Sequence, residues 1–395
     1  MTRSLADRVR RLSYADRRWL ALYIVGLAVS AALGYWVYGD TRANIEALGQ
    51  GYVSDEIYYV DVARRLLIDV FNVGGREWYE WSGKTGQDYY NPEHPPLGKY
   101  IIGASMLACG DKPECWRLPG AVEAGLVPVI LYIGYATPRR GGWGVLAGLA
   151  AALAASSSAS LRAEGAVAML DIHQAFFSTI AVAALAAERL ELSVIAVGLA
   201  GSVKYSGFFL IPALWFYAPR YCKGCRLSQR LRVFLATTII PPLVTLSLSV
   251  PIILHFGLKW FWENSVVGAL GWHTTSRPPG PPTSSPLGWM FNVNPFYFDY
   301  NTMLGGLANP ILYITAIAIG AAVIVYSASR DAWPASGSAS FYSSLGLYLL
   351  LYNLGALHIP GLHGNKTLYS FYLVQLAPLA AATFGDAVSV RAEQP

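Results

Sequence analysis

The sequence WLALYIVGLAVSAALGYWVY, from Trp19 to Tyr38, contains no charged residue. A helix needs about 20 such residues to cross the hydrocarbon core of a bilayer. The run is too long for the apolar core of a signal peptide, and no clear small-residue cleavage site follows it. We therefore expect a retained transmembrane helix here.

The rest of the chain has the same character. Its 395 residues are 54% hydrophobic and 13% charged, whereas a soluble domain has about 25% charged residues. Long apolar runs recur as far as Phe384, which leaves no room for a separate soluble domain of about 100 residues. The sequence therefore predicts a single all-α polytopic membrane domain over residues 1–395, a bundle of about ten transmembrane helices.

Basic residues predict the topology. Several arginines precede Trp19, and the positive-inside rule places residues 1–18 in the cytoplasm. We then expect a first large external loop at residues 39–117, a second at residues 257–307 and a cytoplasmic tail at residues 385–395, with both termini in the cytoplasm. The net charge of +5 is spread over short clusters between apolar segments, a distribution that argues against nucleic-acid binding.

Two juxtamembrane helices are expected in the first external loop. Residues 55–71 have apolar side chains at helical spacing, with Ser54 as the N-cap, and predict an amphipathic helix on the membrane surface. The apolar segment from Pro96 to Gly110 has only about fourteen residues, short of a full span. If it crossed, Arg139 and the basic loop 220–232 would lie outside, so we interpret it as a second surface or re-entrant helix.

The four cysteines form two close pairs. Cys109 and Cys115 fall near the end of the first external loop, where an oxidising compartment would permit a disulfide, but the sequence alone leaves their state open. Cys222 and Cys225 form a C-x-x-C without a second half-site, which is a weak signal for zinc or redox chemistry.

Ionisable residues gather where the external loops meet the helices. Charges at a membrane boundary are costly, so they commonly mark function. A mixture of carboxylates and cations at one membrane face suits a reaction on a phosphate-bearing lipid, in which cations hold the phosphate and a carboxylate takes a proton from the acceptor. The residues concerned are Asp55, Glu56, His94, Lys99, Arg117, Arg162, Glu164, Asp171, His173, Lys204, His273, Arg277 and Lys366.

Structural explanations compete for individual members of this set. The pair Asp55-Glu56 could face a helix dipole, and Lys99 and Arg117 could be snorkelling cations that anchor helix ends. Asp171 is harder to explain in this way, because it lies in an otherwise largely apolar run.

Short motifs follow one another in a characteristic order: DE at 55–56, HPPLGK at 94–99, RLPGA at 117–121, MLD at 169–171 and SVKYSG at 202–207. The segments SSPLGW at 284–289, ANP at 308–310 and KTLY at 366–369 continue the series. This order resembles that of the protein O-mannosyltransferases, membrane enzymes that use dolichyl-phosphate-mannose, and it covers most of the chain.

The resemblance implies a GT-C fold and an inverting transfer of a sugar, mannose, from a polyprenyl or dolichyl phosphate to a hydroxyl acceptor, Ser or Thr of a protein, on the extracytoplasmic face. By matching position it implies Asp55 as the catalytic base and Glu56 as the residue that binds or orients the acceptor. It leaves a homo- or heterodimer open. The remaining residues that it implies in substrate or donor binding are His94, Lys99, Arg117, Arg162, Asp171, Lys204 and Lys366.

The chain also departs from that family. Residues 257–307 are too few for the β-trefoil domain of eukaryotic members, Ser54 stands where an aromatic residue is frequent, and Lys366 stands where arginine is common. The related aminoarabinose lipid A transferases share the Asp-Glu loop and an aspartate at the position of Asp171. A transferase that acts on a lipid or glycan acceptor is therefore an alternative.

Other function classes stay open at this point. A transporter or flippase that uses Asp171 and Lys204 predicts charges near the middle of the membrane and related halves, and a non-catalytic member would bind the polyprenyl lipid only. No metal ligands are assigned, and metal dependence stays open: an acidic pair such as Asp55-Glu56 can coordinate a divalent metal ion, but transfer from a lipid monophosphate does not require one.

Overall fold

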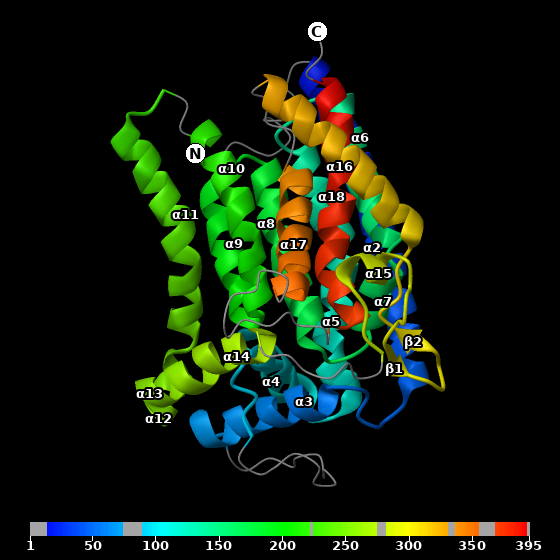
Figure 1. Ribbon diagram of the computed structural model, residues 1–395. Helices are drawn as coiled ribbons and strands as arrows, with labels where there is room; N and C mark the ends of the chain where they lie inside the picture. Colours follow the sequence, from blue (N-terminus) through cyan, green and yellow to red (C-terminus); the bar gives the residue numbers. More distant parts are fainter. Residues whose placement is uncertain are drawn as a thin grey trace, which may run out of the picture.

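The long helices of the chain run side by side in one bundle (Figure 1), in a computed structural model that describes residues 14–73, 89–221, 224–274, 282–330, 336–354 and 368–392. The bundle helices are α2 (Tyr14–Leu48), α5 (Pro113–Ala136), α6 (Gly142–Ser156), α8 (Leu170–Ala186), α9 (Leu190–Val203), α10 (Ile211–Tyr221), α11 (Leu227–Leu248), α16 (Pro310–Arg330), α17 (Ser336–Asn353) and α18 (Leu373–Ala392). This arrangement confirms the prediction of an all-α polytopic membrane protein.

Length and apolar composition identify the helices that could cross a membrane. Within the described ranges five helices meet both criteria, or six if α6 and the short α7 (Ala159–Gly165), bent by 63°, count as one span. Four shorter apolar helices, among them α8 and α9, fall below the length criterion. The number of about ten spans stays a prediction.

The first helix extends beyond its apolar run. We expected it to end at Tyr38, but α2 continues to Leu48, so residues 39–48 of the predicted first external loop are helical. The Thr41 hydroxyl donates to the Val37 carbonyl at 2.8 Å, one turn earlier in the same helix. The residues that follow are largely good helix formers. The apolar pattern thus marks the expected bilayer boundary and not the end of the helix.

Small residues let the bundle helices approach closely. A Cβ atom on Gly34 of α2 would lie 2.3 Å from the carbonyl oxygen of Gly125 on α5. On the other side of α5, a Cβ atom on Gly134 would lie 2.7 Å from Ala183 of α8. Because lipid tails are as apolar as the helices, close van der Waals packing of this kind stabilises helix pairs in membranes. α5 is therefore packed between α2 and α8.

Two shorter helices, α3 (Glu56–Arg65) and α4 (Leu97–Cys109), lie at one end of the bundle, and α3 runs across it (Figure 1). α3 continues into a π-helical turn, Leu66–Val70, which confirms the amphipathic helix predicted over residues 55–71. α4 has only 13 residues and fails the length criterion for a span.

Ser54 does not cap α3, so that prediction was wrong. The N-cap is Asp55, whose side chain makes no capping hydrogen bond. Ser54 has a φ of 54°, a left-handed conformation that few non-glycine residues adopt. Its hydroxyl has no hydrogen-bond partner among the described residues. The chain therefore turns sharply immediately before the acidic pair.

The segment that includes the predicted second external loop also lies toward this end of the bundle (Figure 1). It contains α12 (Val250–Phe256), α13 (Leu258–Phe261), the π-helical turn Trp262–Val267, α14 (Gly268–Thr274), α15 (Pro286–Met290) and a small antiparallel hairpin of β1 (Tyr297–Asp299) and β2 (Leu304–Gly305). Tyr297 pairs with Gly305 and Asp299 with Leu304. α2 starts and α18 ends at the opposite end of the bundle (Figure 1).

Candidate functional site

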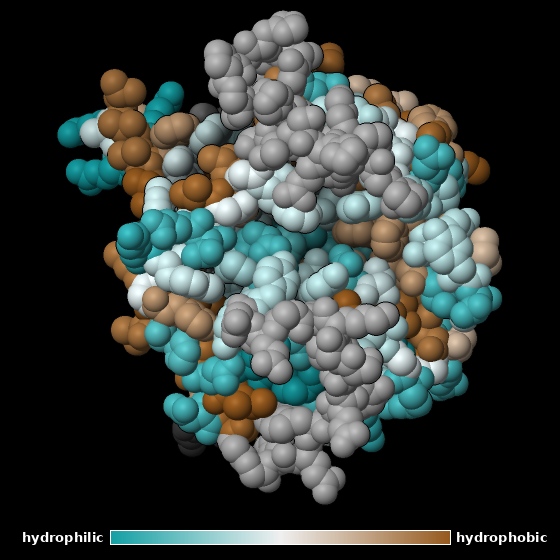
Figure 2. Space-filling view, turned by 60° about the horizontal axis from the view of Figure 1, so that its bottom comes forward, coloured by the Kyte–Doolittle hydropathy of each residue, from teal (hydrophilic) through white to brown (hydrophobic). Residues whose placement is uncertain are grey.

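A cavity of about 390 Å³ lies at the end of the bundle that α3 and α4 cover. Its polar and charged lining includes Glu93, His94, Lys204 and Tyr372. Figure 2 brings this end forward and shows hydrophilic residues gathered across its middle. The cavity joins segments that are far apart in sequence: the turn before α4, the end of α9, the π-helical turn before α14 and the start of α18.

Asp55 lies at the start of α3. Burial raises the pKa of its carboxyl from 3.8 to about 6, the nearby Lys204 ammonium opposes this rise, and the Asp171 carboxylate adds to it. A carboxylate with a pKa close to neutrality is well matched to general-base catalysis, because it is ionised at neutral pH yet still accepts a proton readily. Asp55 is thus electrostatically coupled to Lys204 and Asp171.

The adjacent Glu56 has a different environment. Its side chain is fully buried, and its carboxylate accepts hydrogen bonds from Nε and Nη2 of Arg117, both at 2.8 Å. It also accepts from the backbone N–H groups of Val53 and Ala168, again at 2.8 Å. These partners leave no oxygen of Glu56 free for an acceptor or a metal ion. Glu56 instead ties the start of α3 to α5 and to the loop before α8.

Arg117 is fully buried as well. Besides its bidentate pair with Glu56, it donates to the carbonyl of Gly49 at 2.8 Å and to that of Gly51 at 2.7 Å. Bidentate arginine–carboxylate pairs are among the stronger and more directional polar contacts. The structure therefore places Arg117 inside the fold, where it holds the turn that leads to Asp55, and not in the cavity where we expected it to bind a donor phosphate.

Lys204 and Asp171 form a buried ion pair at the cavity. The Lys204 Nζ lies 3.0 Å from both carboxylate oxygens of Asp171, and the amide of Gln375 donates to the same carboxylate. The ammonium also lies 4.5 Å from the ring centre of Tyr372. Lys204 is 4% exposed and Asp171 is not exposed, so Asp171 orders Lys204 at the cavity wall.

Lys99 is engaged by the backbone of the preceding turn. Its buried Nζ donates to the carbonyls of Asn91, of His94 at 2.8 Å and of Tyr90 at 3.5 Å. A lysine that satisfies several carbonyls in this way fixes the shape of the turn. Lys99 therefore supports residues 90–94. It does not line the 390 Å³ cavity, but it lines a second cavity of about 400 Å³ between α3 and α4.

The same turn presents Glu93 and His94 to the cavity. The Glu93 carboxylate accepts from the hydroxyl of Tyr89 and from the amide of Asn91 at 3.1 Å. The ring of His94 packs edge-on against that of Tyr59, with 6.0 Å between ring centres. His94 is thus brought to the predicted site, together with an acidic neighbour that we did not select.

Two further predicted residues do not join this cluster. Arg162 pairs with Asp40 at 2.9 Å, donates to the carbonyl of Ser156 at 2.6 Å and lies over the ring of Trp36 at 4.9 Å. It therefore joins α7 to α2. Lys366 lies outside the described residues, so the prediction for it stays a prediction.

Several site residues were missed from the sequence. Glu93 directly precedes the HPPLGK motif, and its acidic character next to that motif was a usable signal. Gln375 interrupts the apolar run that begins at Leu373, and a buried amide there could also have been noticed. Tyr372 carried no such signal, because one tyrosine among many aromatic residues is unremarkable in sequence.

The described residues also bear on metal binding. No group of three or more His, Cys, Asp or Glu side chains in the described ranges could hold a metal ion. The acidic pair Asp55-Glu56 does not offer two free carboxylates, because the four hydrogen bonds to Glu56 occupy both of its oxygens.

Comparison with known proteins identifies the fold of this chain. No protein-family model matches the chain, and no curated protein does. Among solved structures the chain is similar to ArnT from Cupriavidus metallidurans bound to undecaprenyl phosphate, with a TM-score of 0.57 and 14% identity over 93% of this chain and 60% of that one. The apo state of ArnT gives a TM-score of 0.55, again with 14% identity, over 94% of this chain and 59% of that one.

The S. cerevisiae protein O-mannosyltransferase Pmt1-Pmt2 complex bound to the sugar donor also matches, with a TM-score of 0.40 and 16% identity over 60% of this chain and 34% of that one. The narrower O-mannosyltransferase assignment therefore stays a prediction. The chain spans about 60% of the length of the ArnT chain that it matches. Its likeness to ArnT shows that this integral, multi-pass membrane protein has the GT-C fold.

Proposed function

We propose that this protein is an inverting membrane glycosyltransferase that moves a sugar, mannose, from a polyprenyl phosphate to a hydroxyl group on the extracytoplasmic side. The observation that carries the proposal is the placement of Asp55. It is a carboxylate with a raised pKa at the start of α3, and it interacts electrostatically with the Lys204–Asp171 pair. Lys204 lines the cavity, whereas Asp55 is not part of the lining. The sugar and the protein hydroxyl acceptor come from the motif order, and the lipid phosphate is favoured by the likeness to ArnT bound to undecaprenyl phosphate.

Asp55 acts as the general base. The acceptor hydroxyl gives its proton to the Asp55 carboxylate while its oxygen bonds to the anomeric carbon of the sugar. The bond from that carbon to the phosphate oxygen breaks, and the lipid phosphate leaves with the electron pair. Attack from the face opposite the leaving group inverts the anomeric configuration. A positioned general base of this kind contributes roughly 10²- to 10⁴-fold to the rate.

Lys204 stabilises the charge that grows on the leaving phosphate. It lines the cavity, and its partner Asp171 holds it in place. Cations aimed at developing charge in a water-poor site are worth more than the same cations in water. Glu56 and Arg117 support the reaction indirectly. Their hydrogen bonds to the backbone of Gly49, Gly51 and Val53 fix the turn that leads to Asp55.

No step of the proposed transfer runs through a metal ion. The acidic pair would be the natural ligand set, but the Glu56 carboxylate is occupied by Arg117 and by two backbone N–H groups. Lys204, which lines the cavity, supplies positive charge for the leaving phosphate.

The transport alternative predicts coupling charges near the middle of the membrane. In the described residues, Asp55, Lys204 and Asp171 interact with one another at the α3 end of the bundle. The Cys109–Cys115 disulfide supports an extracytoplasmic position for this end, because disulfides persist mainly in oxidising compartments. These observations favour the transferase.

The proposal is tested with the purified protein in lipid nanodiscs, radiolabelled polyprenyl-phosphate-mannose and membranes as the source of acceptor. We expect label in acceptor with an anomeric configuration opposite to that of the donor. Label in protein supports the Ser/Thr acceptor, and label in lipid or glycan supports the alternative acceptor. Absence of transfer from any lipid-linked sugar, together with donor movement across a vesicle membrane, would support the transporter instead.

A further inference from the structure

A second buried polar cluster lies outside the cavity, around Asp111 in the turn between α4 and α5. One carboxylate oxygen of Asp111 accepts from Nε of Arg64 at 2.6 Å. The other accepts from Nη2 of Arg64 at 3.1 Å and from the indole N–H of Trp116 at 2.7 Å. The side chains of Arg64 and Asp111 are 7% and 2% exposed. None of these groups takes part in the chemistry proposed above.

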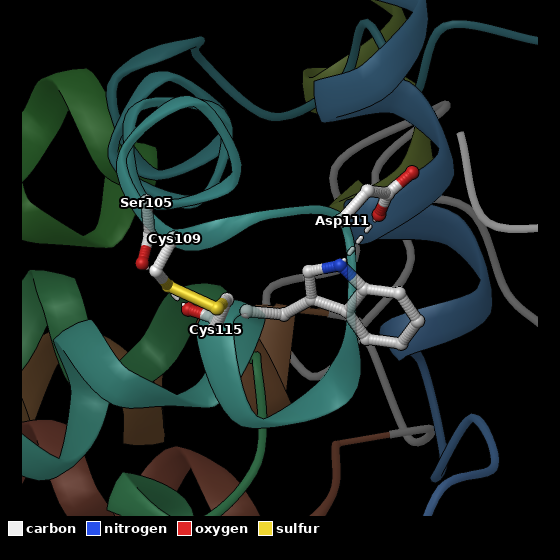
Figure 3. Close-up of a disulfide and its surroundings, with 5 residues drawn as sticks. Ser105, Cys109, Asp111 and Cys115 are labelled. Atoms are coloured by element: carbon white, nitrogen blue, oxygen red, sulfur yellow. Dashed lines mark hydrogen bonds between the residues drawn. A yellow bond between two sulfur atoms is a disulfide. The ribbon is translucent and has the colours of Figure 1, made fainter. Parts of the chain in front are cut away.

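A disulfide closes the turn that carries Asp111. Cys109 is the last residue of α4, and Cys115 lies in the first turn of α5, so the bond between them encloses Asp111 (Figure 3). The hydroxyl of Ser105 on α4 donates to the Cys115 carbonyl at 2.6 Å and joins the two helices a second time. The covalent closure therefore restricts where Asp111 can lie.

The Asp111 cluster reaches the turn before Asp55. Nη2 of Arg64 also donates to the hydroxyl of Tyr52 at 3.1 Å. The ring of Tyr52 stacks on that of Trp116, with 5.0 Å between ring centres and 8° between planes. Tyr52, Arg64, Asp111 and Trp116 thus form a closed ring of contacts. Two of its members flank Asp55 in sequence, one before the acidic pair and one on α3.

The geometry points to Asp111 as a positioning residue for Asp55, held in register by the Cys109–Cys115 disulfide, so that the rate of transfer depends on the oxidised state of that bond. We refer to Tyr52, Arg64, Asp111 and Trp116 as the Asp111 ring. This inference rests on the proposed transferase function. It assigns the disulfide a role in catalysis in addition to holding α4 and α5 together.

The elements that the Asp111 ring contacts determine which kinetic constant should change when the ring is lost. The Asp111 ring contacts the Asp55 turn and α3, whereas donor binding depends on Lys204, which belongs to the end of α9. Loss of the ring should therefore lower kcat and leave the KM for the lipid donor unchanged. A misplacement of about 1 Å can cost on the order of 10²-fold in rate, so we expect kcat to fall about 10- to 100-fold.

The first test reduces the folded wild-type protein, so a failure to fold cannot explain the result. Cys109 is exposed and Cys115 is buried, so a dithiol such as dithiothreitol attacks the Cys109 sulfur and releases Cys115 as the leaving thiolate. The second thiol of the reagent then resolves the mixed disulfide. Two electrons and two protons pass to the protein, and the reagent becomes a cyclic disulfide. We expect kcat to fall on reduction and to recover on reoxidation.

The second test asks whether the disulfide acts through Asp111. The variant Asp111→Asn should show the same fall in kcat as the reduced wild type, and reduction should have no further effect on it. Lys112→Gln is the matched control, because Lys112 is exposed and lies within the same closed turn. Hydrogen exchange of the backbone amides of residues 52–60 gives a readout without activity, and it should rise on reduction and in Asp111→Asn but not in Lys112→Gln.

The outcomes separate this inference from the proposed function. If the oxidised wild type transfers no sugar, the proposed function fails. If it transfers sugar at the same rate after reduction, or if Asp111→Asn loses as much again on reduction, the role of the Asp111 ring is overturned. A rise in donor KM at constant kcat would also contradict it, because the ring would then act on the donor site.

Discussion

The two adjacent carboxylates should respond to neutralisation in opposite directions. Asp55→Asn removes a carboxyl whose ionised form is disfavoured by burial, so we expect the folded protein to become more stable at neutral pH. Glu56→Gln removes the partner of a buried guanidinium, so we expect it to become less stable. The backbone contacts of residue 55 do not depend on its side chain, which makes Asn a conservative replacement.

The magnitude follows from the pKa of Asp55. Its rise from 3.8 to about 6 corresponds to about 3 kcal/mol of unfavourable free energy in the ionised folded state. Well below pH 3.8 the carboxyl is protonated in both the folded and the unfolded protein, and there is no difference. As pH rises to about 6, the unfolded state loses its proton first, so the wild type loses stability. Above pH 6 the difference is constant.

The Asp55→Asn variant lacks this loss. Its gain over wild type should be about 0.5 kcal/mol at pH 4 and should reach up to about 3 kcal/mol at pH 7.5. For Glu56→Gln we expect a loss of about 3 to 5 kcal/mol, because Arg117 would remain buried without a counter-charge.

The assay is thermal unfolding of both variants and the wild type in the same detergent, followed by tryptophan fluorescence at pH 4 and pH 7.5. Glu46→Gln is the control, because Glu46 is an exposed acid on α2. The reasoning is refuted if Asp55→Asn is less stable than wild type at pH 7.5, or if its gain is the same at both pH values.

Other predictions concern the site more broadly. The kcat/KM of the wild type for sugar transfer should fall as pH drops below about 6, because protonated Asp55 cannot accept a proton. A fall that begins only near pH 4 would contradict the assignment of Asp55 as the base. Lys204→Gln should raise the donor KM and lower kcat in the transfer assay. The double variant Lys204→Gln with Asp171→Asn should be more stable to unfolding than Lys204→Gln alone but should not regain activity. Restored activity would exclude Lys204 as the phosphate cation. Arg162→Gln should leave kcat within about twofold of wild type in the same assay, because Arg162 lies outside the cavity.

Much of the fold was predictable from the pattern of apolar and basic residues. The apolar runs marked the bundle, and the segment Pro96 to Gly110 forms the short helix α4, as its length predicted. Its position as a surface or re-entrant helix stays a prediction. The end of α2 was not predictable in this way, because helix propensity continues beyond the apolar run that faces lipid. The hairpin of β1 and β2 was not predicted, since strands of three and two residues are too short for a periodic signal.

The sequence identified some of the residues that meet near the cavity, among them His94, Asp171 and Lys204, but not the partners of each charged residue. Sequence placed Arg117 and Lys99 among the phosphate-binding cations, and the structure instead buries both against carbonyls and, for Arg117, a carboxylate. A motif gives the order of charged residues along the chain. It does not give their partners, and a buried cation with its hydrogen bonds satisfied by the protein has little left to offer a ligand.

The same limit explains the missed residues. Gln375 and Asp171 are far apart in sequence and meet only because α18 and α8 pack together. The link from Asp111 to Arg64 likewise depends on how α3 and α4 lie against each other. Contacts of this kind follow from tertiary packing, and no local pattern in either segment indicates them.

The most direct test of the central claim is the rate of sugar transfer by Asp55→Asn compared with wild type and Glu46→Gln, at saturating polyprenyl-phosphate-mannose. We expect kcat to fall by about 10²- to 10⁴-fold in Asp55→Asn, with unchanged donor binding and full activity in Glu46→Gln. Transfer by Asp55→Asn at the wild-type rate would contradict the assignment of Asp55 as the catalytic base.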